Sequence, residues 1–185
     1  ACWLGAAVWG TRLLHAYSFP PGASGTPAEV WPEGAGVSRA DGIATLVVAL
    51  HPECSCSRAT LAELGVILAE TTPHLRAVVI FSDLDPEHPA GASPLFKTAH
   101  DLPGVSLVRD RDGEILKKFR FVTSGETRFY RPDATLAFRG GITGSRGHEG
   151  ENPGRSRVIA LTRQPTAAPH LGSTPVFGCA LFNSE

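Results

Sequence analysis

Two closely spaced cysteines are the residues of this chain best suited to chemistry. Cys54 and Cys56 stand in the run LHPECSCSRA, where an apolar stretch gives way to an amphipathic one. The first turn of a helix presents unpaired backbone N–H groups and the positive end of the helix dipole, and both favour a thiolate over a thiol. If a helix begins here, we expect the two thiols to be reachable by solvent and biased toward the ionised form.

Such a pair is suited to thiol-disulfide exchange. In this interpretation Cys54 is the attacking thiolate and Cys56 the resolving thiol. A disulfide between residues i and i+2 closes a very small ring, which would be strained and easily reduced. Arg58 and His51 would help the helix to stabilise the thiolate, whereas the charge of Glu53 opposes them.

Two more segments could contribute to the site. Cys179, in the run PVFGC near the end of the chain, is either a third thiol that resolves the pair or an incidental cysteine of the tail. The run GGITGSRGHEG, residues 140–150, contains five glycines that allow close backbone approach. It either covers the site, with Arg146 and His148 supplying charge or a proton, or simply connects two elements.

Metal binding is the competing interpretation. His51, Cys54, Cys56 and Cys179 offer soft sulfur and imidazole ligands suited to Cu(I) or Zn. Under the redox interpretation we expect no cofactor, and the partners would be protein thiols or disulfides. A third class of function is a non-catalytic interaction domain that needs neither chemistry.

Composition excludes other classes of function. The chain has 185 residues, 42% of them hydrophobic, and a net charge of -1, so it lacks the basic surplus that nucleic-acid binding needs. Four cysteines, widely scattered apart from the central pair, are too few for a disulfide scaffold. The length suits one domain with an arm at either end.

Four segments are expected. Residues 1–19 are mostly apolar but interrupted by Arg12 and His15, and we interpret them as the end of a signal or membrane anchor, the alternative being an amphipathic arm packed on the domain. Residues 20–40 are rich in proline and glycine and suit a linker. Residues 41–164 would form the domain, and residues 165–185 a C-terminal arm that carries Cys179.

The order of elements in the domain predicts an α/β fold. Continuous apolar runs at 44–50 and 77–81 are typical of strands buried on both faces. The helix between them would be capped by Ser55 or Ser57 and ended by Pro73. Shorter elements are expected at 94–99, 105–108 and 114–119, followed by a hairpin of 126–131 with 135–139 and a last helix over 153–163.

This order of strand, cysteine motif, helix, strand, hairpin and helix resembles the thioredoxin fold, with a central mixed sheet flanked by helices. More narrowly, HPECSCSRA, TSG, GGITGSRGHEG and VFGC look like motifs of bacterial membrane-anchored, thioredoxin-like proteins of the RedB type. The resemblance implies a protein tethered on the periplasmic side of the inner membrane.

The chain also departs from the thioredoxin pattern. Its motif is Cys-x-Cys, so Ser57 stands where the usual resolving cysteine would be. Thioredoxins also have a cis-proline facing the motif, whereas this chain has FVTSG at residues 121–125. The missing proline puts the usual binding of an extended substrate peptide in doubt.

Overall fold

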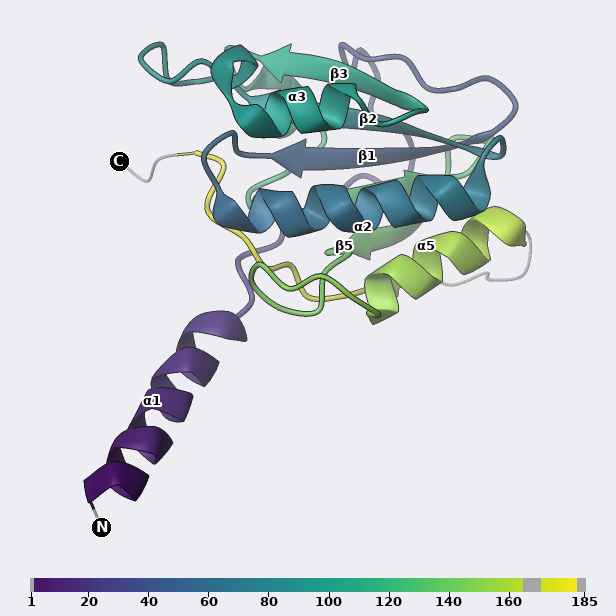
Figure 1. Ribbon diagram of the computed structural model, residues 1–185. Coiled ribbons are helices and arrows are strands. Elements are labelled where there is room, and N and C mark those ends of the chain that lie inside the picture. Colours follow the sequence, from purple (N-terminus) through teal and green to yellow (C-terminus); the bar gives the residue numbers. More distant parts are fainter. Residues whose placement is uncertain (1, 165–170, 183–185) are drawn as a thin grey trace.

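The computed structural model describes residues 2–164 and 171–182, which contain both strands and helices. The elements are α1 (Cys2–Ser18), β1 (Ala44–Leu50), α2 (Ser55–Thr71), β2 (Leu75–Ser82), a 3-10 turn (Ala90–Ala92), α3 (Pro94–His100), β3 (Val105–Asp110), α4 (Glu114–Lys118), β4 (Thr127–Tyr130), β5 (Leu136–Gly140), α5 (Pro153–Arg163) and β6 (Gly172–Ser173). They form one mixed sheet with the strand order β3-β2-β1-β4-β5-β6, flanked by helices (Figure 1). The predicted α/β architecture is therefore confirmed.

The strand-helix-strand unit β1-α2-β2 forms the centre of the molecule. All seven residues of β1 are buried, and β1 pairs in parallel with β2, so that Val47 lies opposite Val78. A strand buried on both faces needs apolar residues at every position, which the sequence supplies. The carboxyl end of β1 therefore lies at the start of α2, and the cysteine motif lies at this junction.

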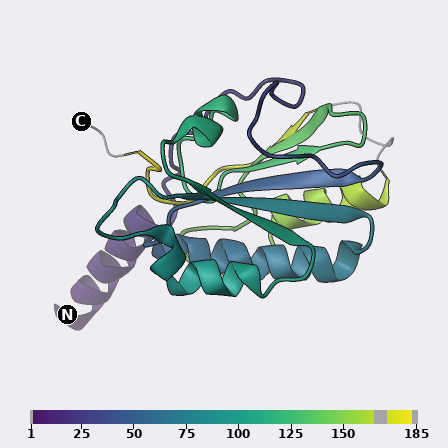
Figure 2. The ribbon, with the colours of Figure 1, turned by 90° about the horizontal axis from the view of Figure 1, so that it is seen from above.

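Helices cover both faces of the sheet. On one face, α2 and α5 pack against inward-facing residues of β1 such as Leu46 and Val48. On the other face, α4 and the residues after it pack against Val47 and Ala49. Figure 2 shows α2, α3 and α5 on one side of the sheet and α4 on the other.

The second half of the sheet runs antiparallel and includes a strand that the sequence pattern did not predict. β4 pairs with β1, and β5 pairs with β4, as the predicted hairpin requires. The two residues of β6, which belong to the C-terminal arm, add a parallel pairing with β5 at the edge. The arm therefore begins its return across the domain as part of the sheet.

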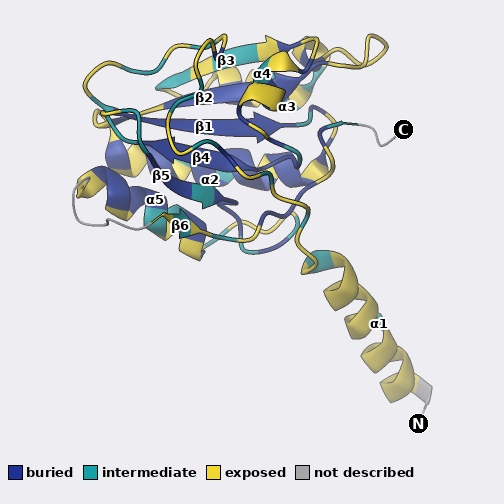
Figure 3. Cartoon of the chain, turned by 180° about the vertical axis from the view of Figure 1, so that it is seen from behind, coloured by how far each residue is buried: buried dark blue, intermediate teal, exposed yellow. Residues whose placement is uncertain are grey.

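The N-terminal helix α1 projects away from the domain, and its apolar side chains are exposed (Figures 1 and 3). Among residues 2–164 and 171–182, no helix is both long and apolar enough to cross a membrane. The proline-rich segment after α1 lies against the domain. In it, Trp31 packs edge to face on Phe119 and Tyr130.

Candidate functional site

Cys54 lies at the N-cap of α2. Pro52 follows the end of β1, the chain turns, and the Ser57 N–H donates to the Cys54 carbonyl as the helix begins. The prediction that Ser55 or Ser57 caps this helix is wrong. The Ser57 hydroxyl instead donates to the His51 carbonyl at 3.0 Å, so it holds the turn that precedes the motif.

Three sulfur atoms gather at this point. The Sγ atoms of Cys54 and Cys179 lie 2.9 Å apart, although the two residues are 125 positions apart in the chain. Cys54 and Cys56 are only 2% and 4% exposed, whereas Cys179 is exposed. The expectation that the central pair is open to solvent is therefore wrong, because the C-terminal arm lies against Cys54.

The three thiols differ in their tendency to ionise. Burial opposes ionisation of Cys54, but hydrogen bonds from the Cys179 thiol and from nearby backbone N–H groups outweigh it, so the pKa of Cys54 is lowered. Burial and the neighbouring Cys54 charge raise the pKa of Cys56. Burial and contact with Cys54 raise the pKa of Cys179 to about 12. Cys54 is therefore the thiol that ionises first, and Cys179 stays protonated beside it.

The C-terminal arm is held beside Cys54 by backbone pairing. The Ser124 N–H donates to the Cys179 carbonyl at 2.8 Å, the Leu181 N–H donates to the Val122 carbonyl at 2.9 Å, and Thr123 and Ala180 form an antiparallel bridge. Figure 1 shows the arm, in yellow, passing the start of α2. Residues 122–124 therefore pair with an extended segment even though the proline expected in that loop is absent.

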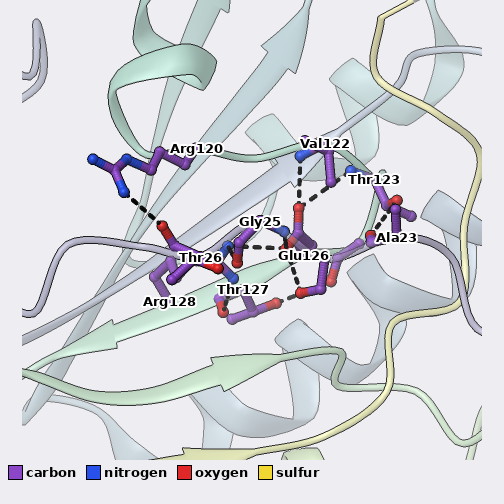
Figure 4. A network of polar contacts seen from close by, with 11 residues as sticks. Ala23, Gly25, Thr26, Arg120, Val122, Thr123, Glu126, Thr127 and Arg128 are labelled. Carbon is purple, nitrogen blue, oxygen red and sulfur yellow. Dashed lines mark hydrogen bonds and ion pairs between the residues drawn. The ribbon is translucent and has the colours of Figure 1, made fainter.

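A buried carboxylate fixes the loop that pairs with the arm. Glu126 Oε2 accepts the N–H groups of Val122 and Thr123, and its Oε1 accepts Arg128 Nη2 and the Gly25 N–H (Figure 4). Glu126 and Arg128 are both fully buried. The sequence pattern did not predict this role of Glu126. The sequence sign of this role was a pair of opposite charges, Glu126 and Arg128, at strand spacing. An alternating strand pattern assigns such charged residues to the solvent face.

The glycine-rich loop at residues 140–150 borders the site. Arg146 Nη1 donates to the Gly178 carbonyl at 2.8 Å, and the Arg146 charge favours ionisation of Cys56 and Cys179, so it offsets part of the rise in the pKa of each. The Gly147 backbone also contributes a hydrogen bond to Cys56. This loop therefore contacts both the arm and the motif, as the site-covering alternative expects.

The remaining predicted site residues lie outside this contact. His148 and Arg58 are exposed, and neither is among the main causes of the thiol pKa shifts. His51 is half-buried, burial lowers its pKa, and its Nδ1 accepts the Glu53 N–H at 3.2 Å. In the part of the chain that the structure describes, no three histidine, cysteine or acidic side chains are grouped to hold a metal ion.

Comparison with known proteins defines the fold. No protein-family model matches the chain, and no curated protein matches it. An uncharacterized conserved protein from Geobacillus kaustophilus superimposes with a TM-score of 0.63 at 18% identity, covering 90% of this chain and 95% of its own. A hypothetical protein from Sinorhizobium meliloti 1021 gives 0.62 at 17% identity, covering 89% of this chain and 97% of its own.

A third solved structure identifies the kind of fold. Yeast Sco1 superimposes with a TM-score of 0.50 at 14% identity, covering 78% of this chain and 95% of its own. At these identities the likeness concerns the fold alone. Together with the strand order, it shows that the chain has a thioredoxin-like fold with a Cys-x-Cys motif at the start of α2.

Proposed function

We propose that the protein is a thiol-disulfide oxidoreductase in which Cys54 attacks and Cys179 resolves. The observation that carries this proposal is the 2.9 Å contact between the two Sγ atoms at the N-cap of a helix. Two sulfurs at this separation need to approach by only about 0.9 Å to reach a disulfide length of about 2.05 Å. Cys56 stands only two residues from Cys54 in the chain, so a bridge between them would close a very small, strained ring, which makes Cys56 the less favoured partner.

The reaction is a balanced exchange of two electrons. The Cys54 thiolate attacks one sulfur of a client disulfide, forms a mixed disulfide and releases the other client sulfur as a thiolate. That thiolate takes the proton of Cys179, and the resulting Cys179 thiolate attacks the Cys54 sulfur. The second client sulfur leaves as a thiolate and takes from solvent the proton that Cys54 gave up on ionising, so the client ends with two thiols and the protein with a disulfide between Cys54 and Cys179.

The ionisation of Cys179 is coupled to the first step. Its raised pKa results from burial, from its hydrogen bond with Cys54 and from the charge of the Cys54 thiolate. A mixed disulfide removes that charge and the sulfur's strong acceptor character, so the pKa of Cys179 falls once Cys54 has reacted. Cys179 therefore becomes a nucleophile only when there is a mixed disulfide to resolve.

Single cysteine variants test this assignment. In an insulin-reduction assay with dithiothreitol we expect Cys54→Ser to abolish turnover and Cys179→Ser to slow it, because only dithiothreitol can then resolve the mixed disulfide. Cys56→Ser is the matched control and should keep most of the activity. Mass-spectrometric mapping of the oxidised protein should find a disulfide between Cys54 and Cys179. Full turnover by Cys54→Ser would remove the redox proposal.

We further propose that α1 attaches the protein to a membrane surface. The support is the apolar surface of α1, on which Trp3, Leu4, Trp9 and Leu14 are each more than half exposed. Trp and Leu side chains of such a helix favour the lipid interface. Membrane fractionation of cells expressing the chain should recover it with the membranes, and replacing Trp3 and Trp9 by Ser should reduce that fraction.

Copper binding by the same sulfurs is the second candidate. Two adjacent thiols, one of them with a lowered pKa, are soft ligands of the kind that selects Cu(I). Cys54 and Cys179 would hold the ion. When bound, the ion would be coordinated by the Cys54 thiolate, which would then be unavailable for thiol-disulfide exchange. Elemental analysis after anaerobic purification should find about one equivalent of copper if this function operates. The expected loss of copper in Cys179→Ser, with retention in His51→Ala, would identify the ligands.

A further inference from the structure

The arm occupies a strand edge that is built independently of it. The inward N–H groups of Val122 and Thr123 are taken by the Glu126 carboxylate. The Val122 carbonyl and the Ser124 N–H are the groups that pair with the arm, through Leu181 and Cys179. Because Glu126 holds the loop through groups that the arm does not use, we expect the edge to keep its shape when the arm leaves.

Ser124 adds a second support to this edge. Its hydroxyl accepts the His51 N–H at 2.9 Å and lies 2.9 Å from the Ser57 hydroxyl. Gly125 continues the support, since its N–H donates to the Ala49 carbonyl at 2.7 Å. The edge is therefore tied to the end of β1 and to the first turn of α2, the same elements that position Cys54.

The arm shows which side chains fit this edge. A Cβ atom at Gly178 would lie only 1.8 Å from the Ser124 carbonyl oxygen, so only glycine can stand at that position. Cys179 follows and brings its sulfur to Cys54. Leu181 is 2% exposed and belongs to the apolar cluster that includes Val47. The edge at residues 122–124 thus accepts a glycine, then a cysteine, and an aliphatic side chain two residues after the cysteine.

We propose that residues 122–124 form a docking strand for client segments with the pattern glycine, cysteine, any residue, aliphatic residue, and that the arm is a tethered competitor for the same strand. Pairing through backbone groups is how an extended peptide adds to an exposed sheet edge. The proposal rests on the proposed function, because it places the client cysteine against Cys54. It goes beyond that function by naming the client sequence and the device that excludes other segments.

A non-covalent binding assay tests docking separately from redox activity. The probe is a fluorescent peptide with the sequence of residues 175–182 and serine in place of cysteine, titrated against the reduced full-length protein. In Gly178→Ala the arm cannot dock, so the strand is vacant. If the arm is seated about 90 to 99% of the time in the wild type, the variant should bind the peptide about 10 to 100 times more tightly.

Matched controls separate arm release from a general effect of adding a methyl group. At Gly144 a Cβ atom would meet nothing closer than 3.8 Å, so Gly144→Ala should bind the peptide as the wild type does. A peptide with alanine in place of glycine should bind Gly178→Ala at least about tenfold more weakly, because its methyl group meets the Ser124 carbonyl. If Gly178→Ala does not fold, Leu181→Asp releases the arm by another route.

Hydrogen exchange of the Ser124 amide supplies the decisive readout. That amide should lose protection in Gly178→Ala and regain it when the peptide is added. An unprotected Ser124 amide together with no peptide binding at millimolar concentration overturns the proposal, as does binding that leaves the amide unprotected. Because serine replaces the peptide thiol, either result is distinct from loss of the Cys54 chemistry.

Discussion

Joining Cys54 to Cys179 should stabilise the protein far more than joining Cys54 to Cys56. The two residues are 125 positions apart, and closing a loop of this length removes about 5 kcal/mol of chain entropy from the unfolded state. The same relation gives less than about 2 kcal/mol for a bridge between residues i and i+2, before any strain is subtracted. The native state loses little on oxidation, because the sulfurs already touch.

Urea denaturation of the oxidised and reduced protein measures this difference. Trp31 packs against Phe119 and Tyr130, so its fluorescence reports on the folded domain. With a slope of about 2 kcal/mol per molar urea, a gain of about 5 kcal/mol moves the midpoint upward by about 2.5 M. The reduced protein with a non-thiol reductant serves as the reference.

Cysteine variants decide which bridge is responsible. The gain should persist in Cys56→Ser and disappear in Cys179→Ser. If oxidation raises the stability by less than about 2 kcal/mol and the gain survives Cys179→Ser, the bridge lies within the Cys-x-Cys motif. The assignment of Cys179 as the resolving thiol would then be refuted.

Two further variants probe the network and the thiol. Glu126→Gln keeps an acceptor but leaves the buried Arg128 without its counter-charge, so the free energy of unfolding in urea should fall by about 3 to 5 kcal/mol. The control is Glu29→Gln at an exposed position, which should change it by less than about 0.5 kcal/mol. A loss below about 1 kcal/mol in Glu126→Gln would contradict the role of the network. The rate of Cys54 alkylation by iodoacetamide, measured against pH, should follow a pKa below the ordinary value of a cysteine. The inflection of this rate profile should lie at higher pH in Cys179→Ala than in Cys179→Ser, because only serine keeps a hydrogen-bond donor beside the thiolate. Identical rate profiles in the two variants would show that the hydrogen bond does not lower the pKa of Cys54.

Local pattern predicted most of the fold. The strands at 44–50 and 77–81 and the helix at 153–163 each bury a face that the sequence marks with apolar residues at the right period. The N-cap of α2 was predicted wrongly because serine is a more common N-cap residue than cysteine, which favoured Ser55 and Ser57 over Cys54. β6 was missed because a two-residue strand pairs only by virtue of the fold and has no period of its own.

Only the part of the site that is formed by residues close in sequence was predictable. The helix start at Cys54 follows from Pro52 and the apolar strand before it, whereas the position of Cys179 depends on how a distant arm returns across the sheet. The role of Glu126 was also hidden, because nothing local shows that a charged residue in a strand faces inward. The sequence therefore predicted a thiol at the start of this helix, where the structure has Cys54, and left open whether Cys56 or Cys179 pairs with it.

In the proposed mechanism the arm has two opposing tasks, and one variant should separate them. It must leave the strand at residues 122–124 for a client to dock, and it must return for Cys179 to attack the mixed disulfide at Cys54. Gly178→Ala keeps all three thiols but prevents the return, since a Cβ atom there meets the Ser124 carbonyl oxygen. We therefore expect this variant to form the mixed disulfide with a client at least as fast as the wild type and to resolve it more slowly. Acid quenching followed by mass spectrometry should show the mixed disulfide accumulating in Gly178→Ala but not in the control Gly144→Ala. Equal amounts of mixed disulfide in the two variants would show that docking of the arm does not position the resolving thiol.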